Sequence, residues 1–359
     1  MFANFPTRRL FRLCLQAIFV TSSWGLLLVS PAFCQRTFAQ VLPQSIPSQD
    51  LEAAGLYQQG VIRYYRHDLV NAEMFLRQAL QRDPNMAAAY IFLGNIMLRQ
   101  NRMDLAIQNY SESIRINPNF AEGYFNLGLG LHQQGQNQAA LTAYRQALLI
   151  NPTMAEAHYN MGLLLQADGQ LSEAIAAYSQ AIAFDSGNVD AHLNLAIALQ
   201  KNGQISEAIQ AYRQVISLAP DRASAYNNLG NLLMTQGQTV AAIDVYREGL
   251  RRIPNSAELY HSIGLAWYNQ GKSQNGLAAL KRASKFYRTQ DNFAAAEQIE
   301  QFMQQVSRTG NGTVGENPNP GEPAANEATR ENSNNENPQT RTELPRLIEF
   351  GQPDSNSRL

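Results

Sequence analysis

Apolar residues recur at helical spacing through most of the chain. Tyr124, Leu127 and Leu131 lie three or four positions apart, and a second apolar stretch runs from Leu141 to Ile150 after a short polar break. This spacing predicts a helix that buries one stripe of its surface. Two such helices with a turn between them predict a helix pair.

The pair recurs every 34 residues, in units that begin at Ala53, Ala87, Ala121, Ala155, Val189, Ala223 and Ala257. The recurring residues are proline (Pro84, Pro118, Pro152, Pro220, Pro254), a first glycine (Gly60, Gly94, Gly128, Gly162, Gly230, Gly264), alanine (Ala72, Ala106, Ala140, Ala174, Ala208, Ala242), an aromatic ring (Tyr110, Tyr144, Tyr178, Tyr212, Tyr246) and a second glycine (Gly135, Gly169, Gly203, Gly237, Gly271). Seven such repeats over 53–290 predict an all-α fold, a right-handed superhelical solenoid of antiparallel helix pairs.

Each recurring residue has a physical role. The first glycine and the alanine let the two helices approach closely, and the tyrosine fills the space beside them. The second glycine is expected to end the first helix in a left-handed conformation, which glycine adopts without a steric cost. His67 and Asn101 stand at this place in the first two repeats, and Ala196 replaces the first glycine once.

The order aromatic, Leu-Gly, Ala, aromatic, Ala, Pro resembles the tetratricopeptide-repeat pattern over about residues 53–290. The last repeat departs from it, with Gly276 for alanine, Leu280 for the aromatic ring and Arg288 for proline. The resemblance implies a superhelix whose concave wall, lined by the first helix of each repeat, binds other polypeptides.

The two ends of the chain differ from the repeats. Residues 1–39 predict an export signal, with Arg8, Arg9 and Arg12 before an apolar run and a cleavage site near Ala39. The expected location is the periplasm or an equivalent extracytoplasmic compartment; a retained membrane anchor is the alternative, and the general and twin-arginine export routes stay open. Residues 40–52 predict a linker.

A further helix is predicted over 291–306 to cap the array. Asp291 is expected to cap this helix, and Ala295, Ile299, Phe302 and Val306 share one of its faces. Residues 307–359 are rich in Asn, Pro, Glu, Thr and Gly without apolar periodicity, which predicts a disordered tail.

The charge, the cysteine positions and the absence of catalytic motifs limit the classes of function that we expect. The net charge of −1 gives no reason to expect a nucleic-acid partner. The two cysteines, Cys14 and Cys34, lie in the predicted signal, so the mature chain is expected to have no disulfide, zinc-cysteine site or cysteine nucleophile. No phosphate-binding loop, dinucleotide turn or hydrolase motif is found, so we expect no enzyme, cofactor or metal. His158 and His192 share one position, where an imidazole in place of a packed ring is favoured over a metal pair.

The predicted groove carries one asparagine in each of four consecutive repeats. Asn126, Asn160, Asn194 and Asn228 resemble the asparagine ladder in the repeat superhelix of the O-linked N-acetylglucosamine transferase, where such side chains hold the backbone of an extended partner. A carboxamide can both donate to and accept from a peptide unit. The alternative is that these asparagines bond between neighbouring repeats.

Neighbouring positions predict an apolar groove with an acidic edge. The apolar candidates are Phe125, Tyr159, Leu193, Leu129, Leu163 and Ile197, and the acidic ones are Glu122, Glu156 and Asp190. The expected partner is an extended protein segment of basic or apolar character. A clamp for a carboxylate-ended peptide is rejected, because its basic positions are Ile91, Glu156 and Asn160 here. The other functions considered are a self-associating structural array and a recruiting accessory of a cell-envelope enzyme.

Overall fold

The computed structural model of the chain describes residues 49–309, and these residues form helices without a strand. The first helices of the seven pairs are α3 (Leu51–Tyr65), α5 (Ala87–Arg99), α7 (Ala121–Gln133), α9 (Ala155–Ala167), α11 (Val189–Lys201), α13 (Ala223–Thr235) and α15 (Ala257–Asn269). The second helices are α4 (Leu69–Arg82), α6 (Met103–Ile116), α8 (Asn137–Ile150), α10 (Leu171–Phe184), α12 (Ile205–Leu218), α14 (Thr239–Arg252) and α16 (Ser273–Thr289), and α17 (Phe293–Thr309) follows them.

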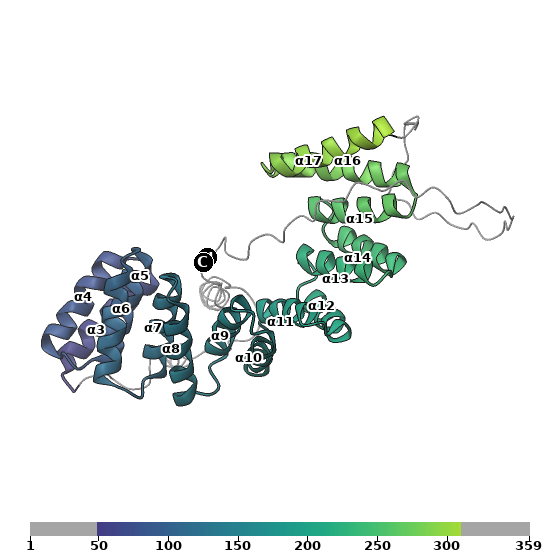
Figure 1. The fold of residues 1–359 in the computed structure, drawn as a ribbon. Helices are drawn as coiled ribbons and strands as arrows, with labels where there is room; N and C mark the ends of the chain where they lie inside the picture. Colours follow the sequence, from purple (N-terminus) through teal and green to yellow (C-terminus); the bar gives the residue numbers. More distant parts are fainter. Residues whose placement is uncertain (1–48, 310–359) are drawn as a thin grey trace, which may run out of the picture.

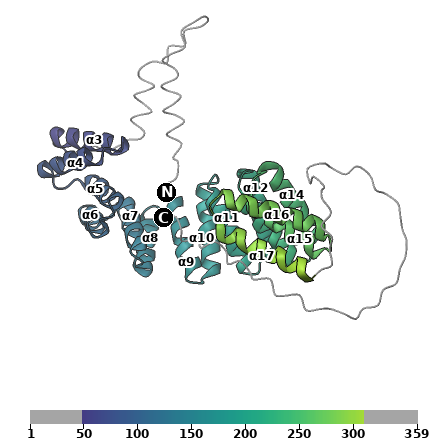
Figure 2. The ribbon, with the colours of Figure 1, turned by 90° about the horizontal axis from the view of Figure 1, so that it is seen from above.

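The helix pairs stack in sequence order into a curved array. Figure 1 shows the odd-numbered helices from α5 to α13 on the inner side of the curve and their even-numbered partners on the outer side. Figure 2, the view from above, shows the same order from α3 to α11, and the later helices overlap one another in that view. The expected all-α solenoid of antiparallel helix pairs is confirmed.

The first glycine, present in every repeat except the fifth, faces the second helix of its own pair. A Cβ atom built on Gly128 or Gly162 would lie 2.5 or 2.6 Å from the ring of Tyr144 or Tyr178. Both tyrosines are fully buried. Because no real Cβ contact is that short, the tyrosine ring occupies the space that the glycine leaves open.

The second glycine ends each first helix from repeat 3 onward. These glycines have φ between 72° and 80°, while His67 and Asn101 take the same left-handed conformation at 63° and 60°. The predicted helix stop is therefore confirmed, including in the two repeats where the residue is not glycine.

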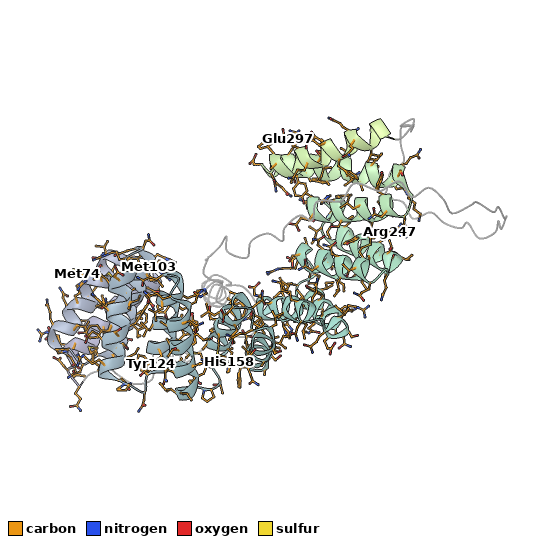
Figure 3. All side chains as sticks on the ribbon, in the orientation of Figure 1. Met74, Met103, Tyr124, His158, Arg247 and Glu297 are labelled. Carbon is orange, nitrogen blue, oxygen red and sulfur yellow. The ribbon has the colours of Figure 1, made fainter. Side chains whose placement is uncertain are left out.

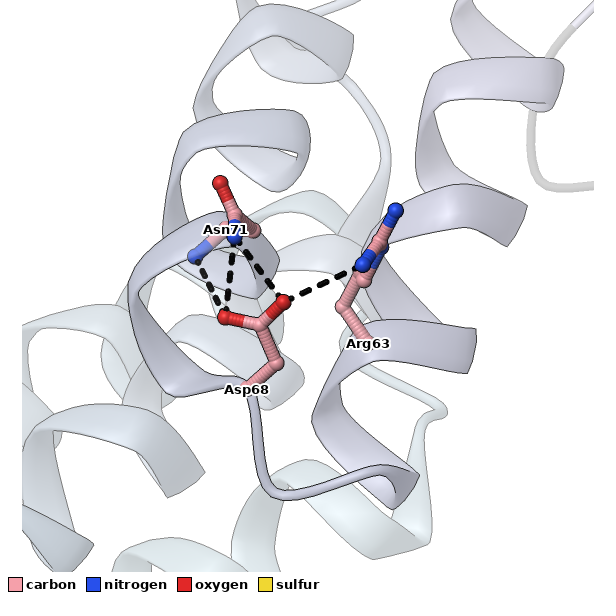
Figure 4. Close-up of polar contacts among 3 residues, drawn as sticks. All are labelled: Arg63, Asp68 and Asn71. Carbon is pink, nitrogen blue, oxygen red and sulfur yellow. Dashed lines mark hydrogen bonds and ion pairs between the residues drawn. The ribbon is translucent and has the colours of Figure 1, made fainter.

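Polar side chains begin several helices, and α4 shows how. Asp68 accepts a hydrogen bond from the backbone N–H of Asn71 at 3.3 Å, and its carboxylate also receives the Asn71 amide and the Arg63 guanidinium (Figure 4). The hydrogen bond from the Asn71 side chain is the main reason that the pKa of Asp68 lies below its ordinary value. The N-terminus of α4 is thus capped by Asp68, which lies in the turn between α3 and α4.

Helix α17 packs on the last repeat. Ala296 and Ile299 are buried, and Ile299 belongs to a small cluster with Leu280 and Ala283 of α16. Glu300 accepts hydrogen bonds from both Arg288 and Ser284 across the same junction. The final repeat therefore does not expose the end of its apolar interior.

The boundaries around α17 correct three sequence predictions. Asn292, not Asp291, caps the helix by accepting from the N–H of Ala295, while Asp291 has φ 59° and ends α16. The helix runs to Thr309, three residues into the predicted tail. At the other end α3 begins at Leu51 with Asp50 as its cap, inside the predicted linker.

We expect the attachment of α17 to depend on pH through Glu300. Its pKa is lowered from 4.5 to about 2, chiefly by the hydrogen bond from Arg288. A carboxyl with a depressed pKa stabilises the fold above its unfolded pKa and loses that stabilisation as pH falls toward the folded one. Stability should therefore decline between about pH 4.5 and 2.

Glu300→Gln should flatten this decline in the thermal midpoint. Glu297→Gln, on an exposed carboxylate of the same helix, serves as the matched control and should keep the wild-type slope. Identical acid profiles for the wild type and Glu300→Gln would contradict the assignment.

The apolar interior is divided along the array. One cluster joins repeats 1 and 2, and another joins repeats 3 and 4. Between them, α7 buries Ala121 and three glycines, whereas α5 buries Ile91, Leu93, Ile96 and Met97. The inner helix of repeat 3 thus contributes no fully buried side chain larger than a methyl group.

The predicted signal at 1–39, most of the linker and the tail beyond residue 309 lie outside the described residues. Among the helices that are described, none combines the length and apolar character needed to cross a membrane.

Candidate functional site

The inner helices meet along two adjoining positions of the repeat, the fifth and the sixth. Asn194, a sixth residue, donates to the hydroxyl of Tyr159, the fifth residue of the preceding repeat, at 3.1 Å. Ser262 donates to Asn227 in the same relation two repeats later. The fifth residue of one repeat therefore neighbours the sixth residue of the next.

This neighbour relation decides what each ladder asparagine does. The fifth residue of the preceding repeat is Ile91 for Asn126 and Phe125 for Asn160, and neither side chain offers a polar atom. The amides of the two asparagines donate instead to the backbone oxygens of Glu122 and Glu156, at 2.7 and 2.8 Å. Both asparagines are half-buried. Their Nδ2 groups are thus engaged within their own helices, and their Oδ1 atoms are the acceptors on the wall.

Asn194 behaves differently from these two. Its hydrogen bond to Tyr159 links neighbouring repeats, which is the alternative role predicted for these asparagines. Burial raises the pKa of Tyr159 to about 12, so this phenol is neutral at neutral pH. For Asn228 the fifth residue of the preceding repeat is Leu193, another apolar side chain, and Asn228 is half-buried.

The predicted apolar side chains form the wall beside the asparagines. Phe125 packs on Tyr144 with ring centroids 5.9 Å apart, and Tyr159 packs on Tyr178 at 6.0 Å. Leu193 is buried, while Leu129, Leu163 and Ile197 are half-buried and pack on the clusters behind them. The wall is therefore apolar and partly accessible.

The three acidic side chains are exposed, but they are not equivalent. Asp190 forms an ion pair with Arg222 at the end of the same repeat. At the place of Arg222, repeats 3 and 4 have Met154 and Asn188, which carry no charge. Within residues 49–309, neither Glu122 nor Glu156 has an ion-pair partner. Glu258, at the same place in repeat 7, is likewise exposed and has no ion-pair partner among the described residues. Glu122 and Glu156 are thus the two carboxylates without an ion pair that stand in successive repeats of the predicted groove edge.

The recurring tyrosine of the second helix also reaches the inner wall. In repeats 2 and 6 its hydroxyl donates to the ninth residue, Tyr110 to Asn95 at 2.8 Å and Tyr246 to Asn231 at 2.6 Å. Repeats 3 and 4 have Leu129 and Leu163 at this place. The buried hydroxyls of Tyr144 and Tyr178 have no partner among the described residues.

The first two repeats contain an aromatic cluster that the sequence analysis did not predict. Tyr57, Tyr64 and Tyr65 of α3 surround Phe92 of α5, with centroids 6.0, 5.3 and 6.2 Å from its ring. The Arg99 guanidinium lies 4.3 Å from the centroid of Tyr64. The four aromatic residues stand at the fifth, sixth, twelfth and thirteenth positions of their repeats. This concentration of rings is the feature of the sequence that could have predicted the cluster.

His158 and His192 occupy the place of an aromatic ring. The Nε2 atoms of the two histidines lie 2.9 and 3.2 Å from the carbonyl oxygens of Pro152 and Ser186, and the hydroxyl of Tyr226 donates to the equivalent oxygen of Pro220. His158 and Tyr124, at the same place one repeat earlier, lie along one edge of the array in Figure 3. The packed-ring interpretation is thus supported by the contacts of both imidazoles.

Comparison with known families agrees with the repeat geometry. A profile described as tetratricopeptide repeat matches residues 193–257, and a second, described as TPR repeat, matches residues 94–135, 130–169 and 167–203. The chain belongs to the tetratricopeptide-repeat family. No curated protein matches the chain in sequence.

Solved structures share the tetratricopeptide fold at low identity. PilF of Pseudomonas aeruginosa is 20% identical, with 58% of this chain and 96% of that chain covered and a TM-score of 0.51. A tetratricopeptide-repeat protein from Parabacteroides merdae is 21% identical over 68% of this chain and 99% of that chain, with a TM-score of 0.48. YrrB, described as a TPR protein with an unusual peptide-binding site, is 20% identical over 54% and 97%, with a TM-score of 0.44. The likeness to PilF shows the fold alone.

Tetratricopeptide arrays serve as protein-interaction scaffolds, and this chain shares that architecture. In the part of the chain that the structure describes, no three His, Cys, Asp or Glu side chains gather as metal ligands would.

Proposed function

We propose that the protein is a non-catalytic scaffold or assembly factor that holds an extended polypeptide segment in its inner groove. The observation that carries the proposal is the state of Asn126 and Asn160. One N–H of each amide donates within its own helix, which leaves the Oδ1 atom as an acceptor on a half-buried apolar wall. An extended chain presents backbone N–H donors that fit such acceptors.

Three of the four ladder residues are assigned to this role. The neighbours of Asn126, Asn160 and Asn228 in the preceding repeats are apolar. Asn194 donates a hydrogen bond to Tyr159 and is therefore assigned to joining repeats. Two or three hydrogen bonds of roughly 0.5–1.5 kcal/mol each require apolar help to give micromolar binding. The half-buried side chains Phe125, Leu129 and Leu163 supply that contact.

The test is the combined variant Asn126→Ala, Asn160→Ala, Asn228→Ala. Its binding to peptides selected on the wild-type protein should weaken about tenfold, the loss of roughly 1.4 kcal/mol. Affinity is measured by fluorescence anisotropy, and folding is checked by circular dichroism. The matched control replaces Asn137 and Asn275, exposed asparagines of the outer helices α8 and α16, with alanine. An unchanged affinity in the folded triple variant would remove the ladder from the function.

Export is the second part of the proposal. Its support is the basic start, the apolar run and the small residues before Gln40. We expect N-terminal sequencing of protein from native cells to give a chain that begins near Gln40 in an extracytoplasmic fraction. Recovery of intact Met1 in the membrane fraction would instead show a retained anchor.

A further inference from the structure

The inner face changes chemistry from one end to the other. Repeats 1 and 2 carry the aromatic cluster, repeats 3 and 4 carry the two glutamates without ion-pair partners, and from repeat 5 onward polar side chains of neighbouring repeats bond to one another. A partner in the first four repeats therefore meets aromatic rings and negative charge.

The aromatic cluster has an accessible part. Tyr65 is 59% exposed although its ring contacts both Tyr64 and Phe92. An exposed ring beside half-buried rings can take a further flat or apolar side chain by edge or stacking contacts. Because Arg99 already lies over Tyr64, its positive charge opposes a basic partner residue at this end. The cluster fits an aromatic or bulky aliphatic residue.

The adjoining repeats fit the opposite charge. Glu122 and Glu156 stand at the same place in successive repeats, both exposed, and the nearby end-of-repeat residues Met154 and Asn188 do not neutralise them. This stretch of wall is anionic, which suits a lysine or arginine.

The spacing of the repeats sets the spacing in the partner. Packed helices lie about 8–10 Å apart, and an extended chain advances about 3.3 Å per residue. Side chains that reach neighbouring repeats are therefore two or three positions apart in the partner.

We propose that the groove selects an extended peptide with an aromatic or bulky aliphatic anchor for the Tyr65–Phe92 cluster and, beyond it, two basic residues two or three positions apart for Glu122 and Glu156. The inference rests on the proposed peptide-binding function and assigns its specificity to repeats 1–4. The remaining repeats extend the wall on which the backbone lies.

The experiment begins with selection of random dodecapeptides, displayed on phage, against the full chain. Enrichment of an aromatic residue followed or preceded by Lys or Arg at the stated spacing supports the proposal. A fluorescein-labelled synthetic copy of the best peptide, and a copy with both basic residues changed to Glu, are then measured against two protein variants.

Glu122→Lys, Glu156→Lys should weaken the basic peptide about tenfold at low salt and strengthen the acidic copy, since each attraction becomes a repulsion and exposed charges are screened. The matched control is Glu173→Lys, Glu207→Lys, two exposed first-turn glutamates of the outer helices α10 and α12, which should leave both affinities unchanged. Tyr65→Ala should weaken both peptides equally.

The outcomes separate the specificity from the function. Selected peptides that lose affinity in the asparagine triple variant but show no basic or aromatic preference overturn the specificity and leave the groove function intact. Enrichment of acidic peptides, or equal effects of the inner and outer charge reversals, also overturns the specificity. Failure to select any peptide overturns both.

Discussion

Gly162→Val is expected to lower the free energy of unfolding by about 3 kcal/mol, the upper part of the range for overpacking a core. A Cβ at this place would lie 2.6 Å from Cε1 and 2.7 Å from Cδ1 of Tyr178. The tyrosine is fully buried and its ring packs on Tyr159, so it cannot retreat without moving the groove wall. Two γ-methyl groups enlarge the conflict.

Repeat 5 shows how the array accommodates one methyl group here. Ala196 replaces the glycine, and the hydroxyl of Tyr212 donates to Gln200 at 2.8 Å instead of reaching the ninth residue. A single Cβ is thus compatible with a different tyrosine contact. For this reason we expect Gly162→Ala to cost less than Gly162→Val.

The measurement is urea unfolding followed by far-ultraviolet circular dichroism. Gly55→Val is the matched control, because a Cβ at Gly55 meets no heavy atom within 4 Å among the described residues. Valine is a somewhat better helix former than glycine, so the control should stay within about 0.5 kcal/mol of the wild type. Equal losses in both variants would show that the Gly162–Tyr178 contact is not the cause.

Removing α17 is expected to lower the thermal midpoint by several degrees, while removing residues 310–359 alone should leave it within about 2 °C. The helix covers Leu280 and Ala283, and Ile299 is 3% exposed in the intact chain. Truncation at Gln290 would uncover this end of the array and break the contacts of Glu300 with Arg288 and Ser284.

Two truncated chains, ending at Thr309 and at Gln290, are compared by thermal melting. Ile299→Asp in the full chain provides a point variant with the same intended effect, and Gln301→Asp, on the exposed side of α17, is its control. If both truncations melt alike, α17 does not stabilise the array.

The repeat register predicted the architecture because its residues act through contacts within a repeat. Gly162 and Tyr178 belong to one helix pair, and the left-handed glycines end a helix by local backbone geometry. Such contacts recur unchanged, so one repeat predicts the next. The departure at the last repeat has a physical reason as well: without a proline at Arg288, α16 continues to Thr289, and the cap of the next helix moves from Asp291 to Asn292.

The site was less predictable because its contacts join different positions of the repeat, either within one repeat or between neighbouring repeats. Asn194 is bound by Tyr159 only because the fifth and sixth places adjoin, and Asp190 is neutralised because Arg222 falls at the end of its repeat. Neither relation can be read from one column of the sequence. The aromatic cluster needs rings of α3 and α5 to meet, which requires the packing of the first two repeats.

The small buried residues of α7 make the place of repeat 3 in the array depend on side chains that are only half-buried. At α7 the buried groups are Ala121, Gly123, Gly128 and Gly130. The larger side chains that pack on the neighbouring clusters are Leu127 on one side and Phe125, Leu129 and Leu131 on the other. Phe125 and Leu129 are also proposed to contact the bound segment, so a substitution at either residue would alter helix packing and affinity together.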